Sequence, residues 1–252
     1  MKSLQNKIAI VTGAGSGIGK AIAILFAENG AQVVLTDLRY ENIETIADQI
    51  KKEHGLASCY AADISRSADV NKLFAYTFQT YQRLDILVNN AGVMDDFTPA
   101  GELSDELWDK VIATNLTGAF RTSRAALVPF IDQGSGNIIN IASIGGFSGG
   151  RAGAAYTASK HGLIGLTRNI GYQYANKGIR CNAIAPGGVG TNILVNANPN
   201  PFGFDRMNAG TANMPPAGIP EDIAQIALFL ASETSGFING SIVTADGGWT
   251  AY

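Results

Sequence analysis

Tyr156 and Lys160 stand four positions apart in the segment YTASK. In a helix this spacing places a phenol and an ammonium group on one face. A free tyrosine has a pKa of about 10, which is too high for an efficient proton acceptor at neutral pH. A neighbouring lysine cation favours the phenolate. The pair therefore suits proton transfer at a substrate oxygen, although the bare spacing also arises by chance in surface helices.

A glycine-rich turn, TGAGSGIG at 12–19, follows the first apolar run. Gly13, Gly17 and Gly19 let the backbone turn sharply and approach a pyrophosphate, and the helix that follows offers free N–H groups and a positive dipole end. The spacing Gly13-x-x-x-Gly17-x-Gly19 differs from the standard G-x-G-x-x-G pattern. Glycine-rich turns also have purely structural uses, so the turn indicates a dinucleotide site mainly through its place between a strand and a helix.

Asp37 ends the second apolar run, where an acid can accept hydrogen bonds from the adenosine ribose hydroxyls. A carboxylate there would repel the extra phosphate of NADP, and neither Ser16 nor Leu38 is basic. The sequence therefore predicts NAD(H) in preference to NADP(H). Arg39, two residues further on, is the one nearby group that could hold the phosphate instead.

These residues need elements that position them, and short apolar runs alternate with helix-like segments along the whole chain. The expected strands are Lys7–Gly13, Gln32–Asp37, Ser58–Asp63, Asp85–Gly92, Asn137–Ser143, Ile179–Gly187 and Ser241–Asp246. The expected helices lie near 18–29, 41–54, 66–82, 104–132, 155–176 and 220–231. This alternation predicts one α/β domain over residues 1–252, doubly wound, with a parallel sheet of about seven strands and helices on both faces.

Residues 188–219 break this rhythm, because they are rich in Asn, Pro and Gly and lack a clear period. We expect 192–219 to be a mobile, irregular lid over the substrate. Phe202 and Phe204 would face the same side of an extended stretch. Substrate contacts are expected at the edge where strands end, from Met94, Phe147, Arg151, Phe202, Phe204 and Met207. Arg151 could hold an anionic group, but a solvent-facing loop arginine is the simpler alternative.

Composition excludes several classes of function. The net charge is −3 without a basic stripe, which argues against nucleic-acid binding. No segment reaches about 18 uninterrupted apolar residues, and no apolar signal core is present, so no membrane association is expected and a cytoplasmic location is favoured. Cys59 and Cys181 are expected to be free thiols. With His54 and His161 as the only histidines, no metal site is expected.

The two histidines and the acid pair after NNAG are not expected to take part in chemistry. His161 follows Lys160 but points about 100° away around the helix, which favours a packing or interface role. His54 is expected at a solvated helix end. Asp95 and Asp96, just after the segment NNAG, are expected to form a solvated loop.

With TGAGSGIG at 12–19, Asp63, NNAG at 89–92, Asn115, Ser143, Tyr156, Lys160 and the Pro186-Gly187 pair, the whole chain resembles the short-chain dehydrogenase/reductase family. The resemblance implies that Asn115, Ser143, Tyr156 and Lys160 form a catalytic tetrad. Tyr156 would be the acid/base and Ser143 would orient the carbonyl or alcohol. Lys160 would bind the nicotinamide ribose and lower the tyrosine pKa, while Asn115 would interrupt its helix and hold a proton-relaying water.

The same resemblance implies the cofactor contacts and a homotetramer, with the helices at 104–132 and 155–176 and the last strand as interfaces. The implied cofactor contacts are Gly13, Ser16, Gly17, Ile18, Gly19, Asp37, Asp63, Ile64, Asn90, Ala91, Gly92, Tyr156, Lys160, Pro186, Gly187, Val189 and Thr191.

The expected activity is hydride transfer between NAD(H) and a secondary alcohol or its ketone, with sugars, hydroxy acids, steroids and acyl thioesters all open as substrates. The alternatives are an NADP(H)-preferring carbonyl reductase and a non-catalytic dinucleotide sensor. A methyltransferase on a related sheet is a further rival, but it would leave Tyr156 and Lys160 without a role.

Overall fold

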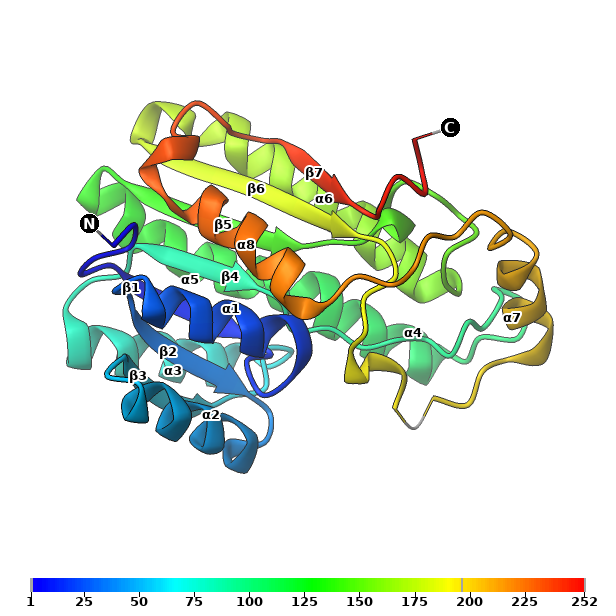
Figure 1. Cartoon of the computed structure of the whole chain (residues 1–252), viewed down its shortest axis with the longest axis horizontal. Coiled ribbons are helices and arrows are strands. Elements are labelled where there is room, and N and C mark those ends of the chain that lie inside the picture. The colour runs from blue at the N-terminus through cyan, green and yellow to red at the C-terminus, as the bar shows by residue number, and fades with distance from the viewer. Residues whose placement is uncertain (1, 196, 252) are drawn as a thin grey trace.

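A computed structural model describes residues 2–195 and 197–251, and its seven strands form one parallel sheet in the order β3-β2-β1-β4-β5-β6-β7 (Figure 1). The strands are β1 (Ile8–Thr12), β2 (Gln32–Asp37), β3 (Leu56–Ala61), β4 (Ile86–Asn89), β5 (Gly136–Ile141), β6 (Ile179–Pro186) and β7 (Ile242–Ala245). The fold prediction is confirmed, with strand bounds that differ by a few residues at the ends. The extent of the domain, 1–252, stays a prediction.

Helices cover both faces of this sheet. The helices are α1 (Gly17–Glu28), α2 (Tyr40–Lys52), α3 (Ser67–Tyr81), α4 (Asp105–Ile112), α5 (Ala119–Gln133), α6 (Ala154–Gln173), α7 (Pro201–Asn208) and α8 (Pro220–Ala231). In Figure 1, α1, α2 and α8 lie on the near face, and α3, α5 and α6 lie on the far face. Both faces are therefore dry, which is why the strands are nearly continuous apolar runs.

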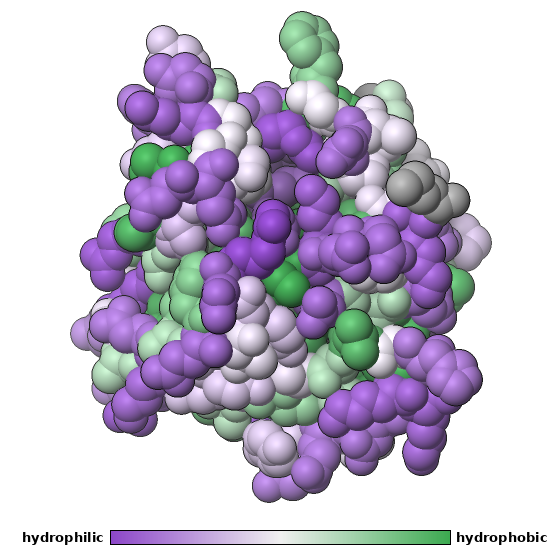
Figure 2. All heavy atoms as spheres, turned by 90° about the vertical axis from the view of Figure 1, so that its left-hand side faces the viewer, coloured by the Kyte–Doolittle hydropathy of each residue, from purple (hydrophilic) through white to green (hydrophobic). Residues whose placement is uncertain are grey.

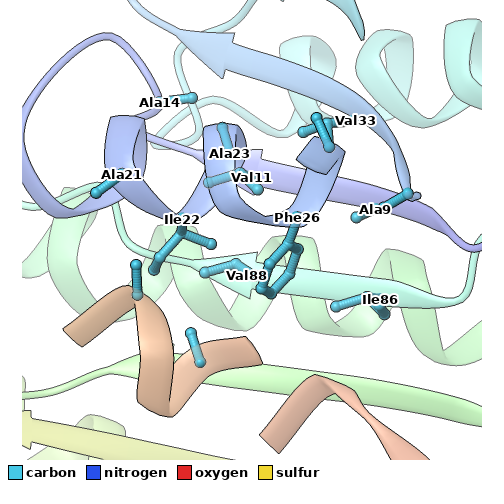
Figure 3. Close-up of a cluster of buried hydrophobic side chains, with 14 of the residues drawn as sticks. Ala9, Val11, Ala14, Ala21, Ile22, Ala23, Phe26, Val33, Ile86 and Val88 are labelled. Carbon is cyan, nitrogen blue, oxygen red and sulfur yellow. The ribbon is translucent and has the colours of Figure 1, made fainter. Parts of the chain in front are cut away.

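The core is divided by the sheet into two layers because successive strand residues point to opposite faces. Val11 and Val88 belong to the layer beneath α1, whereas Ile10 and Leu87 belong to the layer beneath α3 and α5. Figure 3 shows Phe26 reaching from α1 toward the strands. This packing fixes α1, and with it the glycine-rich turn that precedes the helix.

The long helix expected at 104–132 is divided by a π-helix, Ala113–Gly118, between α4 and α5. A π-helix uses i→i+5 hydrogen bonds, so it carries an extra residue per turn and occurs often at functional sites. Asn115 lies inside it and is 1% exposed. The implied interruption of the helix at Asn115 therefore has a structural counterpart.

The expectation of an irregular segment at 192–219 is wrong in part, because α7 forms there. Asn200 caps α7 by accepting a hydrogen bond from the Gly203 N–H at 2.9 Å, and Pro201 occupies the first helical position. Residues two apart in a helix lie about 200° apart, so Phe202 and Phe204 do not share a side. Residue 196 of the segment lies outside the described residues.

The carboxyl ends of all seven strands meet at one edge of the sheet, on the right of Figure 1, where α7 also lies. Figure 2 shows the opposite end of the molecule, which is mostly hydrophilic with scattered apolar side chains. The residues expected to carry chemistry follow the carboxyl ends of the strands, at the edge where α7 lies. In the part of the chain that is described, no helix has both the length and the apolar character needed to cross a membrane.

Candidate active site

The glycine-rich turn between β1 and α1 leaves no room for larger residues. A Cβ on Gly19 would lie 2.2 Å from the carbonyl oxygen of Gly13, and Gly13 and Gly17 have φ of +63° and +53°. Among the hydrogen bonds of the described residues, none uses the backbone N–H of Gly17, Ile18 or Gly19. The N-terminus of α1 therefore presents free donors at this edge, as a pyrophosphate requires.

Asn90 is what holds this turn in place. Its side-chain amide donates to the carbonyls of Thr12 and Gly13 at 3.0 and 3.1 Å. The Thr12 hydroxyl in turn accepts from the backbone N–H groups of Asn90 and Ala91 at 2.9 and 3.1 Å. The segment NNAG thus ties the end of β4 to the turn, and brings Ala91 and Gly92 beside it.

Asp37 lies directly across from the turn. One carboxylate oxygen accepts from the Gly15 N–H at 3.1 Å, and the other accepts from the Arg39 N–H at 3.3 Å. The Arg39 and Leu38 side chains are exposed. The carboxylate of Asp37 is therefore in direct contact with the turn.

Asp63 and Ile64 follow β3 on the same edge. Asp63 accepts from both the backbone and the hydroxyl of Ser65, at 2.9 and 2.6 Å. Ile64 is 6% exposed and packs against Gly118, where a Cβ would lie 2.8 Å from its δ-carbon. The structure therefore uses Ile64 mainly as a core residue of the sheet edge.

The second half of the cofactor set lies after β6. Gly187 donates to the Ala245 carbonyl at 3.0 Å, and Val189 pairs with Gly218 in an isolated bridge. Thr191 lies next to the glycine-rich turn, 3.3 Å from the position of a Cβ on Gly17. A cavity of about 250 Å³ opens between the two segments, lined by Gly17, Lys20, Ala21, Ile24, Gly190, Thr191, Asn192, Pro220 and Glu221. Lys20 was absent from the predicted set.

Tyr156 and Lys160 occupy one face of α6, 9% and 4% exposed. The Lys160 Nζ lies 5.4 Å from the centre of the Tyr156 ring and donates to the Ile141 carbonyl at 2.8 Å. Burial lowers the pKa of Lys160 to about 8, so the ammonium still predominates at neutral pH. The predicted pairing of phenol and ammonium is therefore present in the fold.

The phenol itself is held in its neutral form. Burial raises the pKa of Tyr156 to about 12; the contact with the Ser143 side chain works against that rise, and the charge of Asp95 adds to it. Ser143 has an extended backbone at the end of β5, and its hydroxyl accepts from the Gly145 N–H at 3.0 Å. The Ser143 hydroxyl thus lies beside the Tyr156 phenol, where both groups can meet a substrate oxygen.

Asn115 touches the site through its side-chain amide. Its oxygen accepts from the Val93 N–H at 2.8 Å, and its nitrogen donates to the Val93 carbonyl and the Ser159 hydroxyl at 2.9 and 3.2 Å. Ser159 in turn donates to the Tyr156 carbonyl at 2.7 Å. The side chain of Asn115 is therefore occupied in joining the NNAG loop to α6, and a water held by this residue would have to use its backbone.

The predicted substrate residues do not form one group. Met94 packs with Val111 and Tyr156, whereas Phe147 lines a separate cavity of about 540 Å³ with His161, Arg168 and Ile242. Phe204 packs edge-on against Phe97, with ring centres 5.3 Å apart. The remaining lid residues differ in exposure, with Phe202 61% exposed and Met207 partly buried.

Arg151 lies in the loop before α6 and makes two contacts. Its guanidinium lies 3.8 Å from the ring centre of Trp249 and donates to the Gly210 carbonyl at 3.0 Å. The arginine is partly exposed in its loop, as expected, and it also joins the C-terminal segment to the segment after α7. The smaller predictions hold: His54 is exposed, and Cys59 and Cys181 are free thiols.

Asp95 is the clearest error of the sequence-based interpretation, because it is fully buried rather than solvated. Its carboxylate accepts backbone hydrogen bonds from Gly153 and Tyr156, at 3.0 and 2.8 Å. Burial raises the pKa of Asp95, and the hydrogen bonds from Tyr156 and Gly153 oppose that rise. The acid pair after NNAG gave no local signal of this contact, since the partner is 58 residues away.

A buried polar network behind the site was also missed. Asn89 donates to Ser123 and Asn140 at 3.0 and 2.9 Å, and Asn140 donates to Thr167 at 2.8 Å. Asn residues within apolar strands were the available signal, because a buried amide requires partners. This network joins β4 and β5 to α5 and α6, and so fixes the strand ends that carry the site.

The arrangement can bind an extended dinucleotide along the sheet edge and place a phenol, a serine hydroxyl and an ammonium together at one end. Comparisons with known proteins agree with this description. The family model described as enoyl-(acyl carrier protein) reductase matches residues 13–250. The chain is 41% identical over 251 residues to 3β-hydroxysteroid dehydrogenase 2 of Eggerthella lenta, covering 99% of this chain and 96% of that protein.

Two further relatives extend the comparison. Cyclohexanol dehydrogenase of an Acinetobacter species is 34% identical over 250 residues, covering 98% of this chain and 96% of that protein. A crystal structure described as an NAD(P)-dependent gluconate 5-dehydrogenase of Beutenbergia cavernae, with NADP bound at low occupancy, is 37% identical. It superposes with a TM-score of 0.89 over 99% of both chains.

The chain belongs to the short-chain dehydrogenase/reductase family of oxidoreductases, which use a nicotinamide dinucleotide as cofactor.

Proposed function

We propose that this protein catalyses reversible, NAD(H)-linked oxidation of a secondary alcohol to its ketone, with Tyr156 as the general acid/base. The observation that carries the proposal is the buried pairing of Tyr156 with Lys160, beside Ser143 and at the same sheet edge as the glycine-rich turn. Burial raises the pKa of this phenol, so its exchange of a proton with substrate depends on the Lys160 ammonium and on the positive charge of a bound oxidised nicotinamide, which both favour the phenolate.

Each residue of the site has a separate role in the proposed reaction. A bound nicotinamide supplies the hydride acceptor for oxidation and the hydride donor for reduction. Ser143 holds the substrate oxygen with its hydroxyl, and Tyr156 takes the alcohol proton or returns it to the ketone. The Lys160 ammonium favours the phenolate that forms when the tyrosine gives up its proton. The Asn115 side chain fixes the segment after NNAG to α6 by hydrogen bonds to Val93 and Ser159.

The chain's own residues fit the proposed cofactor. The free N–H groups at the start of α1 suit the pyrophosphate, and the glycines leave the backbone open to it. Asp37 contacts the turn at the point where a ribose 2′-phosphate would be repelled. The Beutenbergia relative has NADP bound, so the role of Asp37 in cofactor choice is tested by substitution below.

Exchange of the acid at the second strand should change the cofactor. The double variant Asp37→Ser with Leu38→Arg should raise the NADP(H)-to-NAD(H) ratio of kcat/KM at least about tenfold, which corresponds to about 1.4 kcal/mol of differential binding. The variant removes the carboxylate that repels the 2′-phosphate of NADP(H) and adds a guanidinium that can bind this phosphate. Leu38→Arg alone is the matched control, and it should give the smaller shift because Asp37 still repels. An unmodified protein that already prefers NADPH would contradict the assignment and implicate Arg39.

For the substrate, we propose an alcohol with an apolar ring or chain rather than a sugar acid. The apolar cluster that contains Tyr156, Val111 and Ala155 has further apolar side chains packed against it, namely Met94, Leu103, Leu107 and Ala152. Arg151, the one predicted anion-binding group, is occupied by Trp249 and Gly210. The named relatives that act on a hydroxysteroid and on cyclohexanol support this choice.

A substrate panel tests the proposal as a whole. The protein with NAD⁺ is offered cyclohexanol, a 3β-hydroxysteroid and gluconate, and NADH absorbance is followed. We expect turnover of the apolar alcohols in preference to gluconate. Tight NADH binding by fluorescence titration with no turnover of any alcohol or ketone would favour the dinucleotide sensor. Failure to bind both NADH and NADPH would contradict the proposal.

We further propose that residues 192–219 close over the substrate, with the two phenylalanines playing different parts. Phe202→Ala should leave the melting temperature unchanged, because that ring is 61% exposed, and should raise KM or alter substrate choice. Phe204→Ala should cost about 1–2 kcal/mol of stability, because it removes an edge-on contact with Phe97 along with buried area. Thermal melts without ligand measure both. Equal, large losses in the two variants would make both rings structural and the lid untenable.

The quaternary and cellular parts of the proposal rest on simpler features. A homotetramer is proposed because α4 and α5 expose several large apolar side chains, namely Trp108, Phe120, Val128 and Ile131. Size-exclusion chromatography with light scattering would test it directly. A cytoplasmic location is proposed because Cys59 and Cys181 are both free thiols.

A further inference from the structure

Helix α6 carries Tyr156 in its first turn but cannot cap itself. Its N-cap residue, Gly153, has no side chain to accept the free N–H groups of that turn. A Cβ at this position would lie 2.6 Å from both carboxylate oxygens of Asp95 and 2.5 Å from the Thr98 nitrogen. The glycine is therefore required by the close approach of another part of the chain.

That part is the loop between β4 and α4, which supplies the cap. The Asp95 carboxylate accepts from the N–H groups of Gly153 and Tyr156, one with each oxygen, and the Thr98 carbonyl accepts from Ala154 at 3.0 Å. A negative charge at a helix N-terminus is stabilised by the helix dipole and by charge-assisted hydrogen bonds. Because one of the two donors is the backbone of Tyr156 itself, the carboxylate bonds directly to the residue that carries the phenol.

The loop is also held from its other side, by α7. The Asp96 carbonyl accepts from the Asn200 N–H at 2.7 Å, and Phe97 packs against Phe204. A Cβ on Gly203 would lie 1.8 Å from the Phe97 carbonyl oxygen, so the helix approaches the loop backbone closely. The loop that contains Asp95 is thus held by contacts to both α6 and α7.

We propose that Asp95 is a positioning residue for Tyr156, which sets both the place of the first turn of α6 and the electrostatic surroundings of the phenol. The inference rests on the proposed acid/base role of Tyr156. The charged groups near the phenol are Lys160 from α6 and Asp95 from the β4–α4 loop, while α4 presents apolar Val111 and Leu107. The Arg151 guanidinium lies against Trp249 and Gly210 instead. Asp95 is the only acid among them.

The negative charge of Asp95 raises the pKa of Tyr156, because it disfavours a second negative charge nearby. Removing the charge should therefore allow the phenolate to form at lower pH. In alcohol oxidation, the midpoint of the pH profile of kcat/KM should move to lower pH, whereas a purely structural defect would leave the midpoint in place.

The test compares Asp95→Ala and Asp95→Asn with the control Asp96→Asn. The control removes one charge from the same loop, at a residue with φ of +53°, a conformation that asparagine tolerates. Asp95→Ala should lose about 10²-fold in kcat, the scale of a misplaced catalytic group, with the NADH dissociation constant unchanged. Asp95→Asn keeps one acceptor oxygen and should retain more activity, with its pH midpoint lowered.

A readout independent of activity separates this inference from the proposed function. Hydrogen exchange of peptides covering Gly153–Tyr156 should accelerate in both Asp95 variants and stay unchanged in Asp96→Asn. The pH midpoint is then measured with the best substrate of the panel. If Asp95→Ala does not fold, Asp95→Asn decides alone: an unshifted midpoint, or exchange and kcat equal to those of the unmodified protein, overturns the proposal.

Discussion

A Tyr156→Phe variant should lose about 10²-fold or more in kcat, the contribution expected from a positioned general acid/base. The substitution removes only the hydroxyl, so the ring keeps its packing against Val111 and the helix keeps its shape. NADH binding by fluorescence titration should therefore stay close to that of the unmodified protein. The loss should appear in both directions, since the same proton is taken in oxidation and returned in reduction.

The matched control lies on the same helix. Tyr172 is 84% exposed near the end of α6, so Tyr172→Phe removes a hydroxyl in solvent and should leave kcat unchanged. A Tyr156→Phe protein that keeps most of its activity would refute the acid/base assignment. Equal losses in both variants would point to a general disturbance of α6 instead.

The order of the elements was predictable because the central strands bury both faces. Continuous apolar runs such as IAIVT and ILVN, separated by helix-length segments, have few alternatives to a parallel sheet covered on both sides. Strand ends were less accurate: the run expected over Asp85–Gly92 forms a strand only over Ile86–Asn89. Its last residues leave the sheet because Asn90 is used to bind the glycine-rich turn.

The parts of the site that follow from spacing were also predictable. Tyr156 and Lys160 are four apart on one helix, and Asp37 ends a strand beside the turn, so local geometry alone brings them into position. What spacing could not reveal were contacts between distant segments. The burial of Asp95 depends on the first turn of α6, 58 residues later, and the stacking of Arg151 depends on Trp249.

The segment at 192–219 shows a different limit. Its Asn, Pro and Gly content suggested irregular backbone, yet Asn200 and Pro201 are good residues for starting a helix. A helix of eight residues has little periodicity from which it could be recognised, and α7 gains support from Phe97 in a remote loop. Local composition and tertiary packing gave opposite indications here, and packing prevailed.

Replacing Lys160 by methionine should have a second large effect on catalysis. Methionine keeps much of the length of the side chain but carries no charge, so the phenolate of Tyr156 loses its nearest cation. We expect kcat/KM for alcohol oxidation to fall about 10²-fold or more, with the pH midpoint moved upward. Lys177→Met is the control, because that lysine is exposed at the end of the same helical region. Unchanged kinetics in Lys160→Met would remove the lysine from the mechanism.

The same variant has an effect on stability that needs no substrate. Burial lowers the pKa of Lys160 to about 8 from its ordinary value of 10.5. Between those two pH values the unfolded chain binds a proton at this group that the native chain has lost, so native stability rises with pH in that window. Below pH 8 both states carry the charge, and the cost of burying it is present in full.

The expected rise across the window is roughly 3 kcal/mol, since each pKa unit corresponds to about 1.4 kcal/mol. Lys160→Met has no proton to lose, so the difference between the two unfolding free energies should change by this amount between pH 8 and 10.5. Losing the hydrogen bond to the Ile141 carbonyl shifts the variant by a constant that does not depend on pH. Urea unfolding of both ligand-free proteins over this range measures the difference, and parallel curves would mean that Lys160 is not held as a buried charge.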